Sequence, residues 1–146
     1  MSDTAHVRIA TTDADLAATW PVMRQLRPHL DEAQYVAMVK SMQPEGYRVA
    51  ALHDDGGRIV AVAGYRFMTM LYAGKLLYLD DLVSDEAERS KGYGRTLLDW
   101  LKQQARDNGC AELQLISHTR RIDAHRFYHR EGFGIECFEF SWKVRP

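Results

Sequence analysis

Hydrophobic residues recur along the chain at two spacings, and each spacing predicts one kind of secondary structure. Repeats of three or four residues predict helices that begin after Thr12 or Asp13, after Asp31, near Gly92 and at Asp123. Alternating apolar and polar positions, or short apolar runs, predict strands at residues 6–10, 47–52, 58–68, 75–83, 111–117 and 135–144. The predicted order is therefore β-α-α-β-β-β-α-β-α-β.

Glycine-rich and polar segments separate these elements and favour an antiparallel meander in the middle of the chain. Residues 54–57, Asp-Asp-Gly-Gly, have the composition of a hairpin turn, and Ala73-Gly74 marks the next turn. Gly109 and Gly132 stand where the last two helices are expected to end. A meander argues against a doubly wound parallel sheet, so we expect an α/β protein of the α+β kind with a mixed sheet.

The composition excludes several classes of partner. The 146 residues carry a net charge of −1, with 46% hydrophobic and 27% charged residues, which predicts a single domain over 1–146 and no nucleic-acid partner. Cys110 and Cys137 are too few for a disulfide scaffold, and we expect both to be small buried residues. The start of the chain lacks a signal-peptide pattern, and no apolar run is long enough to span a bilayer. We therefore expect a cytoplasmic protein without a membrane partner.

Two glycines and three cations stand together where the third helix is expected to begin, in the sequence RSKGYGRT over residues 89–96. Glycine lets the backbone approach a ligand closely, and a helix start offers unpaired N–H groups and the positive end of the helix dipole. Arg89, Lys91 and Arg95 add positive charge. The segment therefore predicts a phosphate site, although it is neither the dinucleotide fingerprint nor a Walker A loop.

Two motifs in this chain resemble those of the GNAT superfamily of N-acetyltransferases. Arg89-x-x-Gly92-x-Gly94 resembles the loop that binds the pyrophosphate of acetyl-CoA, and residues 124–133, AHRFYHREGF, resemble the second signature. The resemblance implies the GNAT fold, with a mixed central sheet of six to seven strands flanked by about four helices. It also implies acetyl-CoA as co-substrate, and the implied contacts are Leu82, Val83, Ser84, Arg89, Ser90, Lys91, Gly92, Tyr93, Gly94, Arg95, Thr96 and Arg121.

The chain departs from the family pattern at three places. Arg121 stands where many members have Asn, and Glu86 stands where many have Pro after the central strand. The chain also ends soon after one long strand, whereas members often end in a hairpin. A partner subunit can cover the exposed sheet edge that this leaves, so a homodimer is possible.

The resemblance implies direct attack of an amine on the thioester of acetyl-CoA. A lysine-like amine has a pKa of about 10.4, so deprotonating it at pH 7 costs about 4.6 kcal/mol. Asp80 and Asp81 are the candidate bases. Because neighbouring strand residues point to opposite faces, we expect only one of them to face the cleft, and we favour Asp81. The N–H groups of residues 82–84 are candidate donors to the carbonyl oxygen, and Tyr128, matching the family's tyrosine, is the candidate acid.

Each of these residues also has a plainer interpretation. Tyr128 can be a core aromatic, and the aspartates can be structural carboxylates. His125 and His129 have the spacing of a zinc helix, but Arg126 replaces the glutamate of such motifs, so we expect no metal site. We expect Trp142 to lie in the core. The alternative function is a non-catalytic acyl-CoA-binding module that senses or scaffolds.

The acceptor is expected to be a small-molecule amine, and an amine with an anionic group is one candidate. Residues 119–132 are similar to the corresponding part of aminoalkylphosphonate N-acetyltransferases. Arginine grips phosphonate or carboxylate groups with two hydrogen bonds, and Arg24, Arg27 and Arg120 are the candidates for this role. Alternatively, Arg120 and Arg121 hold the 3′-phosphate of CoA or lie in solvent.

Overall fold

A computed structural model describes residues 6–145 of the chain. They fall into two compact units, the first ending at Leu115 and the second beginning at Ile116. The first unit contains five strands, three helices and two short 3-10 turns, η1 (Gln43–Glu45) and η2 (Glu86–Glu88). The second contains one helix.

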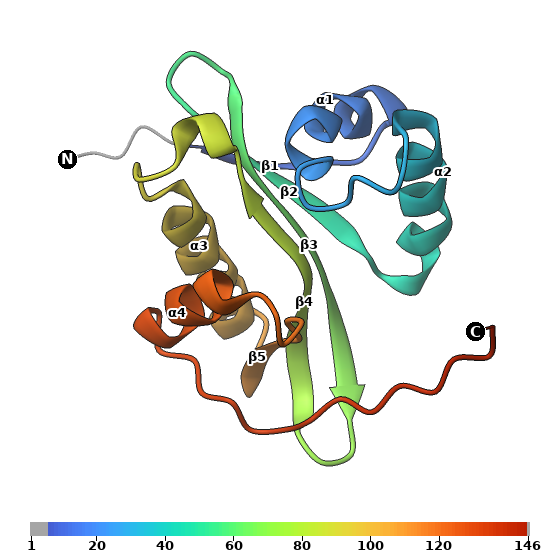
Figure 1. Cartoon of the computed structure of the whole chain (residues 1–146), viewed down its shortest axis with the longest axis vertical. Helices are drawn as coiled ribbons and strands as arrows, with labels where there is room; N and C mark the ends of the chain where they lie inside the picture. Colours follow the sequence, from blue (N-terminus) through green and yellow to red (C-terminus); the bar gives the residue numbers. More distant parts are fainter. Residues whose placement is uncertain (1–5, 146) are drawn as a thin grey trace. The chain divides into compact units, whose positions relative to one another are not determined.

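The first unit is built on a sheet in which the strands follow their order in the sequence (Figure 1). Neighbouring strands are antiparallel, except that β5 runs parallel to β4. Their bounds are β1 (His6–Ala10), β2 (Arg48–His53), β3 (Ile59–Met70), β4 (Gly74–Ser84) and β5 (Glu112–Leu115). The predicted meander of β2, β3 and β4 is confirmed, and so is the mixed sheet.

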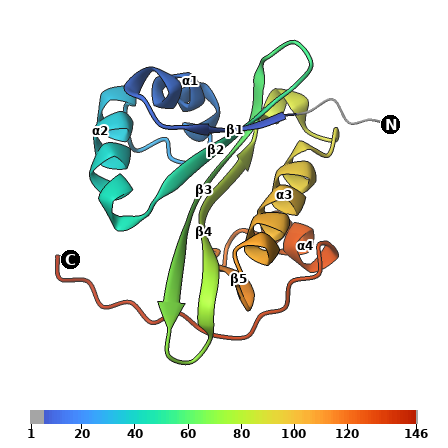
Figure 2. The ribbon, with the colours of Figure 1, turned by 180° about the vertical axis from the view of Figure 1, so that it is seen from behind.

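Helices cover both faces of this sheet, as Figures 1 and 2 show from opposite sides. Helix α1 (Asp13–Met23) and helix α2 (Glu32–Met42) lie on one side, and α3 (Tyr93–Asp107) lies on the other. On the α1 side, the core contains Leu16, Val22, Met23, Tyr35, Val39, Tyr47, Val49 and Val62. On the α3 side, Tyr65 is buried and packs edge-on against Trp100, with ring centroids 5.9 Å apart.

The predicted caps and turns explain where the elements of the first unit begin and end. Thr12 and Asp31 each form a capping box at the start of α1 and α2, so both helices begin where the sequence indicates. The hairpin between β2 and β3 turns at Asp54, whose carbonyl accepts from the Gly57 N–H at 3.0 Å. Gly57 has φ +81°, a conformation that glycine adopts without strain.

A β-bulge interrupts the pairing of β3 with β4. Gly64 lies opposite Asp81, but the next residue, Tyr65, lies opposite Leu79. Asp80 is therefore an extra residue in β4 with no direct partner in β3. A bulge breaks the strict alternation of side chains, and this one lies between the two candidate bases.

The second unit contains helix α4 (Ile122–Arg130), which ends in a Schellman motif. The Phe133 N–H donates to the Tyr128 carbonyl at 2.9 Å, and the Gly132 N–H donates to the His129 carbonyl at 3.1 Å. The stop at Gly132 is thus confirmed. The predicted cap at Asp123 is wrong, because the N-cap is Arg121 and Asp123 lies in the first turn.

The predicted strand at 135–144 is wrong for the described chain. These residues form no ladder, so the sheet has five strands rather than six or seven, while the four α-helices agree with expectation. Trp142, expected in the core, is 86% exposed, and Cys137 is exposed as well. Alternation supplies one apolar face, but a strand also needs a neighbouring backbone, and none pairs with this segment among residues 6–145.

Candidate active site

Helix α3 begins at the predicted phosphate loop without a side-chain cap. Gly92 is the N-cap, with φ +78°. Ser90, two residues earlier, also has a left-handed φ of +77°. The first bond inside the helix runs from the Thr96 N–H to the Gly92 carbonyl at 2.9 Å. The Tyr93 and Gly94 N–H groups precede that bond, so the helix start offers them, with the positive end of the dipole, to an anion.

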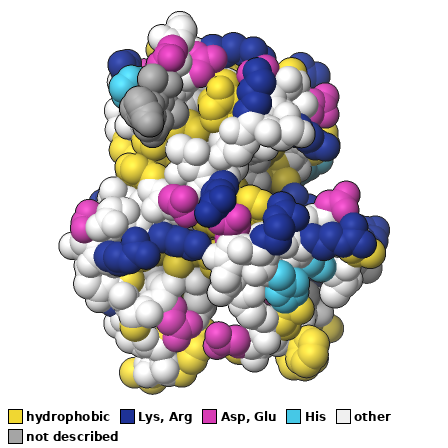
Figure 3. All heavy atoms as spheres, turned by 90° about the vertical axis from the view of Figure 1, so that its left-hand side faces the viewer, with side chains coloured by type: hydrophobic (Ala, Val, Ile, Leu, Met, Phe, Trp, Pro, Cys, Tyr) yellow, Lys and Arg dark blue, Asp and Glu magenta, His cyan; other side chains and the backbone are white. Residues whose placement is uncertain are grey.

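The cations of this loop differ in their surroundings. The Lys91 ammonium lies 2.9 Å from Glu88, and the hydrogen bond to that carboxylate raises the pKa of Lys91. Arg89 and Arg95 are exposed on the same loop. Figure 3 shows one face of the molecule, on which lysine and arginine side chains lie among acidic ones. The start of α3 thus carries the exposed Arg89 and Arg95 beside the Lys91–Glu88 ion pair.

Asp85 anchors the segment that joins β4 to this loop. It is a buried carboxylate whose Oδ2 lies 2.7 Å from Arg58, and whose Oδ1 accepts from Gln25 at 3.2 Å and from the Ala87 N–H at 3.1 Å. Burial acts to raise the pKa of Asp85, but these hydrogen bonds and the Arg58 charge outweigh it, so the pKa lies below its usual value. The loop is thus tied to the end of α1 and to the β2–β3 hairpin.

The last residues of β4 have one edge that no strand occupies. Along β4, the pairing with β5 ends at Leu79, whereas the pairing with β3 continues to Ser84. Among residues 6–145, the edge of Asp80–Ser84 away from β3 therefore carries no ladder. Successive backbone N–H groups of a strand point alternately to its two edges. Some of the N–H groups of Leu82–Ser84 therefore face the open edge, where they can donate to the carbonyl oxygen of acetyl-CoA as predicted.

Asp81 is held by two partners on the α1 side of the sheet. Arg27 donates from Nε to Asp81 Oδ1 at 2.8 Å, and its second nitrogen lies 2.8 Å from the same oxygen. The Tyr47 hydroxyl donates to Oδ2 at 2.5 Å. Burial first, and then the nearby Asp81 charge, raise the pKa of Tyr47 well above its usual value, so this hydroxyl stays protonated and keeps donating.

Asp80 forms a separate pair with Arg66 of β3. Arg66 donates from Nε to Oδ1 at 3.2 Å and from its terminal nitrogen to Oδ2 at 2.8 Å. The pKa of Asp80 is raised by burial, although the Arg66 charge and its hydrogen bonds oppose that shift. The Arg66 guanidinium also lies over the Tyr47 ring, 5.2 Å from its centroid. Both carboxylates therefore point toward Tyr47, and the expectation that only one faces this side is wrong, because the bulge resets the alternation.

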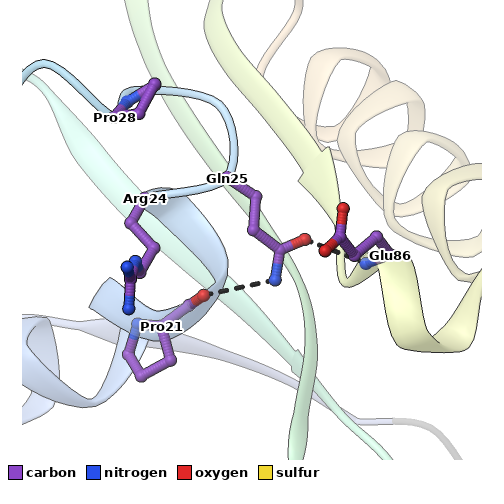
Figure 4. A pocket seen from close by; sticks show the side chains of 5 residues that line it. All are labelled: Pro21, Arg24, Gln25, Pro28 and Glu86. Carbon is purple, nitrogen blue, oxygen red and sulfur yellow. Dashed lines mark hydrogen bonds between the residues drawn. The ribbon is translucent and has the colours of Figure 1, made fainter.

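An open hollow of 420 Å³ lies between the end of α1 and the segment after β4 (Figure 4). Its lining residues are Pro21, Arg24, Gln25, Pro28 and Glu86. Gln25 bridges the two sides, because its oxygen accepts from the Glu86 N–H at 2.9 Å. Among the described residues no carboxylate pairs with Arg24, whereas Arg27 is bound to Asp81. Arg24 is thus a cation available at the wall of the hollow.

Two predicted site residues, Tyr128 and Arg121, lie in the second unit. Tyr128 is on α4, and its ring packs edge-on against Phe133 at 5.7 Å between centroids. Burial raises the pKa of Tyr128, and the Arg121 charge opposes that shift. Tyr128 therefore carries its proton at neutral pH, as an acid must. Arg121 is exposed at the start of the helix.

The histidines of α4 are engaged in hydrogen bonds to backbone. His125 Nε2 lies 2.9 Å from the His118 carbonyl, and His129 Nδ1 lies 3.2 Å from the Phe133 carbonyl. Over residues 6–145, no three potential metal-binding side chains gather in one place. No helix in that range is long and apolar enough to cross a membrane.

Sequence reasoning missed the residues that position the two aspartates and the loop. Gly64 and Arg66 lie in β3, and Tyr47 immediately precedes β2. Asp85 and Gln25 are hydrogen-bonded across sixty residues of sequence. Nothing in their local sequence distinguishes them from ordinary strand or helix residues. Only the register of β3 against β4 brings them together.

Comparisons with known proteins agree with this geometry. The model of the acetyltransferase (GNAT) family matches residues 12–133. The chain is a member of the GNAT acetyltransferase family. It is 36% identical over 141 residues to the uncharacterized N-acetyltransferase YhdJ of Bacillus subtilis, covering 95% of this chain and 99% of that one. A shorter match, 36% over 63 residues, links 43% of the chain to 41% of the aminoalkylphosphonate N-acetyltransferase of Salmonella typhimurium.

A solved structure shares the fold of this chain. The aminoglycoside N-acetyltransferase AAC(6′)-Iy in complex with CoA has a TM-score of 0.78, with 14% identity over 100% of this chain and 99% of that one. At that identity the likeness concerns the fold. GNAT acetyltransferases use acetyl-CoA as co-substrate, so this GNAT acetyltransferase transfers an acetyl group from acetyl-CoA. The start of α3 fits its pyrophosphate, since bare N–H groups and exposed cations meet there.

Proposed function

We propose that this GNAT acetyltransferase acetylates a primary amine of a small molecule by direct attack within a ternary complex. The observation that carries the proposal is the strand β4, which joins three functions within a few residues. It carries two carboxylates at Asp80 and Asp81, then an edge without a strand partner, and then leads into the uncapped start of α3. A base, a donor to the developing oxyanion and a pyrophosphate site are the parts that this transfer needs.

Of the two carboxylates, Asp80 is the better candidate for the base. Asp81 is held by the Arg27 charge and the Tyr47 hydroxyl, which together occupy both of its oxygens. Arg66 likewise donates to both oxygens of Asp80, but burial raises the pKa of Asp80, which makes this carboxylate a stronger base. In this assignment Asp81 positions Arg27 and Tyr47, and Asp80 removes the amine proton directly or through water.

Stabilisation of the oxyanion is assigned to backbone N–H groups, and protonation of the thiolate is assigned to a residue of the second unit. Acetyl-CoA supplies the thioester carbonyl when bound. The N–H groups of Leu82–Ser84 that face the open edge donate to its oxygen as negative charge develops. Tyr128 donates its proton to the departing CoA thiolate; the nearby Arg121 charge, which acts to lower the pKa of Tyr128, favours this donation. Arg121 and the residues of the loop at 89–96 hold the phosphates.

The acceptor is proposed to be an amine that also carries an anionic group. Arg24 supports this, because it lines the hollow beside Glu86 and has no carboxylate partner among the described residues. The local match to an aminoalkylphosphonate N-acetyltransferase favours the same class of acceptor. Arg27 is close to Arg24 in sequence, but it forms an ion pair with Asp81 and is therefore not assigned to the acceptor.

The proposal also includes a cytoplasmic location and a homodimer. The two free cysteines, Cys110 and Cys137, suit a reducing compartment. The homodimer follows from the expectation that a second subunit covers an exposed edge of the sheet.

An acetylation assay over a panel of amines tests the function. The purified protein is given acetyl-CoA with aminomethylphosphonate, amino acids, spermidine or an aminoglycoside, and the free CoA thiol is measured. Thiol release that depends on a primary amine, fastest with an anionic one, supports the proposal. If spermidine or the aminoglycoside reacts faster, the anionic acceptor is wrong. If no amine in the panel is acetylated while acetyl-CoA binds, the small-molecule acceptor is wrong.

A further inference from the structure

A carboxylate lies next to the loop that is proposed to bind the pyrophosphate of acetyl-CoA. Glu88 ends the short turn η2 and directly precedes Arg89, the first residue of that loop. The backbone of Glu88 is held in place, because its N–H donates to the Asp85 carbonyl at 2.8 Å. A negative charge at this position opposes the binding of an anion. Binding of the pyrophosphate therefore requires that the charge of Glu88 is compensated.

Among the described residues, two cations bind this carboxylate. Lys91 Nζ donates to Oε1 of Glu88 at 2.9 Å, and Arg58 donates to Oε2 at 3.4 Å. The hydrogen bond to Glu88 raises the pKa of Lys91, whereas the Arg58 charge opposes that shift. The two positive charges thus repel each other across a shared partner. One of them can leave while the other keeps Glu88 paired.

Arg58 is the cation that is fixed in place. Its backbone closes the β2–β3 hairpin, where its N–H donates to Asp54 Oδ1 at 2.9 Å and its carbonyl accepts from the Asp54 N–H at 2.9 Å. Its guanidinium also lies 2.7 Å from Asp85 Oδ2. Arginine presents several donors in a rigid plane, so it can hold Asp85 and Glu88 at the same time. These contacts are made to the hairpin and to the segment of η2, and not to the loop itself.

Lys91 is the cation that can move. It lies in the loop, three residues after Glu88, and directly precedes Gly92, the N-cap of α3. Its ammonium group is carried by a flexible four-carbon stem. The Tyr93 and Gly94 N–H groups at the helix start are only two and three residues away in sequence. A pyrophosphate bound at those N–H groups is therefore within reach of the Lys91 ammonium.

We propose that Arg58 is a positioning residue for acetyl-CoA, because it holds Glu88 and thereby lets Lys91 turn from this carboxylate to the pyrophosphate. Without the co-substrate, both cations bind Glu88. With acetyl-CoA bound, Lys91 donates to phosphate oxygens and Arg58 keeps Glu88 paired. The co-substrate thus gains a cation without leaving an unpaired carboxylate beside its phosphates. This inference rests on the proposed pyrophosphate site at the start of α3 and does not depend on the acceptor.

Substitutions of Lys91 and Glu88, singly and together, test the exchange. Calorimetry measures the dissociation constant of acetyl-CoA in the absence of an acceptor. Lys91→Gln should weaken binding by about tenfold, since an ionic hydrogen bond to phosphate is lost. Glu88→Gln should strengthen binding by about threefold or more, since nothing then retains Lys91. Lys91→Gln should again cost about tenfold in the Glu88→Gln background. If Lys91 only neutralised Glu88, its removal would have no effect in that background, and this result overturns the exchange.

Arg58→Gln tests the positioning role by the same measurement. Without Arg58, Lys91 stays on Glu88, so acetyl-CoA should bind about tenfold more weakly. Arg58→Gln combined with Glu88→Gln should bind within about threefold of Glu88→Gln alone, because the carboxylate that retained Lys91 is gone. An equal loss in both backgrounds would mean that Arg58 acts independently of Glu88, which overturns its positioning role. Arg8→Gln removes an exposed cation from β1 and should bind as the parent does.

Two acetyl donors separate positioning from a general structural effect. S-acetylpantetheine carries the same thioester as acetyl-CoA but lacks the pyrophosphate and the nucleotide. With an amine that the enzyme acetylates, Arg58→Gln should raise KM for acetyl-CoA and keep kcat at saturation. Its kcat/KM for S-acetylpantetheine should stay within about threefold of the parent. An equal loss with both donors makes Arg58 a structural residue and overturns the proposal.

Two further comparisons keep the outcomes distinct. Arg58→Gln also loses the ion pair with Asp85, so circular dichroism checks its fold. If it does not fold, the Lys91 and Glu88 variants, which leave that pair intact, still decide the exchange. Gly94→Glu is measured alongside as a test of the loop itself. Lost binding in Gly94→Glu with no effect of Lys91→Gln overturns the exchange and leaves the pyrophosphate site standing.

Discussion

The Tyr47 hydroxyl reaches Asp81 through space that only a glycine leaves open. The hydrogen bond is 2.5 Å long, and a Cβ built on Gly64 would lie 1.7 Å from the Tyr47 hydroxyl and 2.6 Å from Asp81 Oδ2. Gly64 lies directly opposite Asp81 in the β3–β4 register, at the edge of the bulge. A glycine at this position therefore sets where both the tyrosine and the carboxylate can lie.

Gly64→Ala is therefore expected to destabilise the protein. Tyr47 is buried, so it cannot swing away, and we expect the free energy of unfolding to fall by about 1–3 kcal/mol, the usual cost of overpacking. Urea denaturation measures this. Gly134→Ala is the control, because a Cβ there meets nothing within 4 Å. Equal stability of the two variants would show that the Tyr47–Asp81 contact tolerates displacement.

Gly94→Glu is expected to separate stability from cofactor binding. A carboxylate in the first turn of α3 interacts favourably with the helix dipole, so the melting temperature should hold or rise. The same carboxylate repels the pyrophosphate, so calorimetry should show acetyl-CoA binding weakened by at least about tenfold. Gln103→Glu makes the same charge change nine residues further along α3 and should bind as the parent does. An unchanged affinity in Gly94→Glu contradicts the phosphate site.

The two aspartates are expected to respond differently to pH. If Asp80 is the base, the parent's kcat/KM falls at acidic pH through the raised pKa of Asp80, because only the ionised carboxylate accepts a proton. Asp80→Asn should lose about 10²–10⁴-fold in kcat near neutral pH and recover toward high pH, where the amine is already free. Asp81→Asn removes a partner of Arg27 and Tyr47, so it should lower the free energy of unfolding. The reverse pattern would assign the base to Asp81.

Tyr128→Phe tests the proposed acid. It keeps the ring that packs on Phe133 and removes only the hydroxyl. The expected loss in kcat is about 10²–10⁴-fold, with the affinity for acetyl-CoA little changed. Tyr72→Phe, on the exposed β3–β4 turn, is the control and should keep full activity. Full activity in Tyr128→Phe would make Tyr128 a structural residue.

Arg24 and Arg27 are expected to differ although they are only three residues apart in the segment after α1. Arg24→Ala should raise KM for an anionic amine by about tenfold and leave KM for acetyl-CoA unchanged, since it removes one ionic hydrogen bond at the hollow. Arg27→Ala breaks the ion pair with Asp81, so it should lower stability for any acceptor. Arg8→Ala, an exposed arginine on β1, controls for the lost charge. If Arg24→Ala leaves the acceptor KM unchanged, the anion lies elsewhere.

Local signals in the sequence determined most of the first unit. Helix starts at Thr12 and Asp31 follow from side chains that bond to amides three residues away, and the turn between β2 and β3 follows from Gly57. These interactions span a few residues, so composition and spacing are enough to predict them. The phosphate loop belongs to the same class, because glycines and cations at a helix start act through their own backbone.

Only the tertiary structure decided how the site residues are arranged. The bulge at Gly64 turned Asp80 and Asp81 toward the same side, and the packing of α1 brought Arg27 to one carboxylate while leaving Arg24 at the hollow. Strand register depends on residues far apart in sequence, and no local pattern records it. Residues 135–144 were mispredicted for the same reason. Their alternating apolar and polar side chains favour a strand, but a strand forms only when a neighbouring strand accepts and donates its backbone hydrogen bonds. The local sequence does not identify that neighbouring strand.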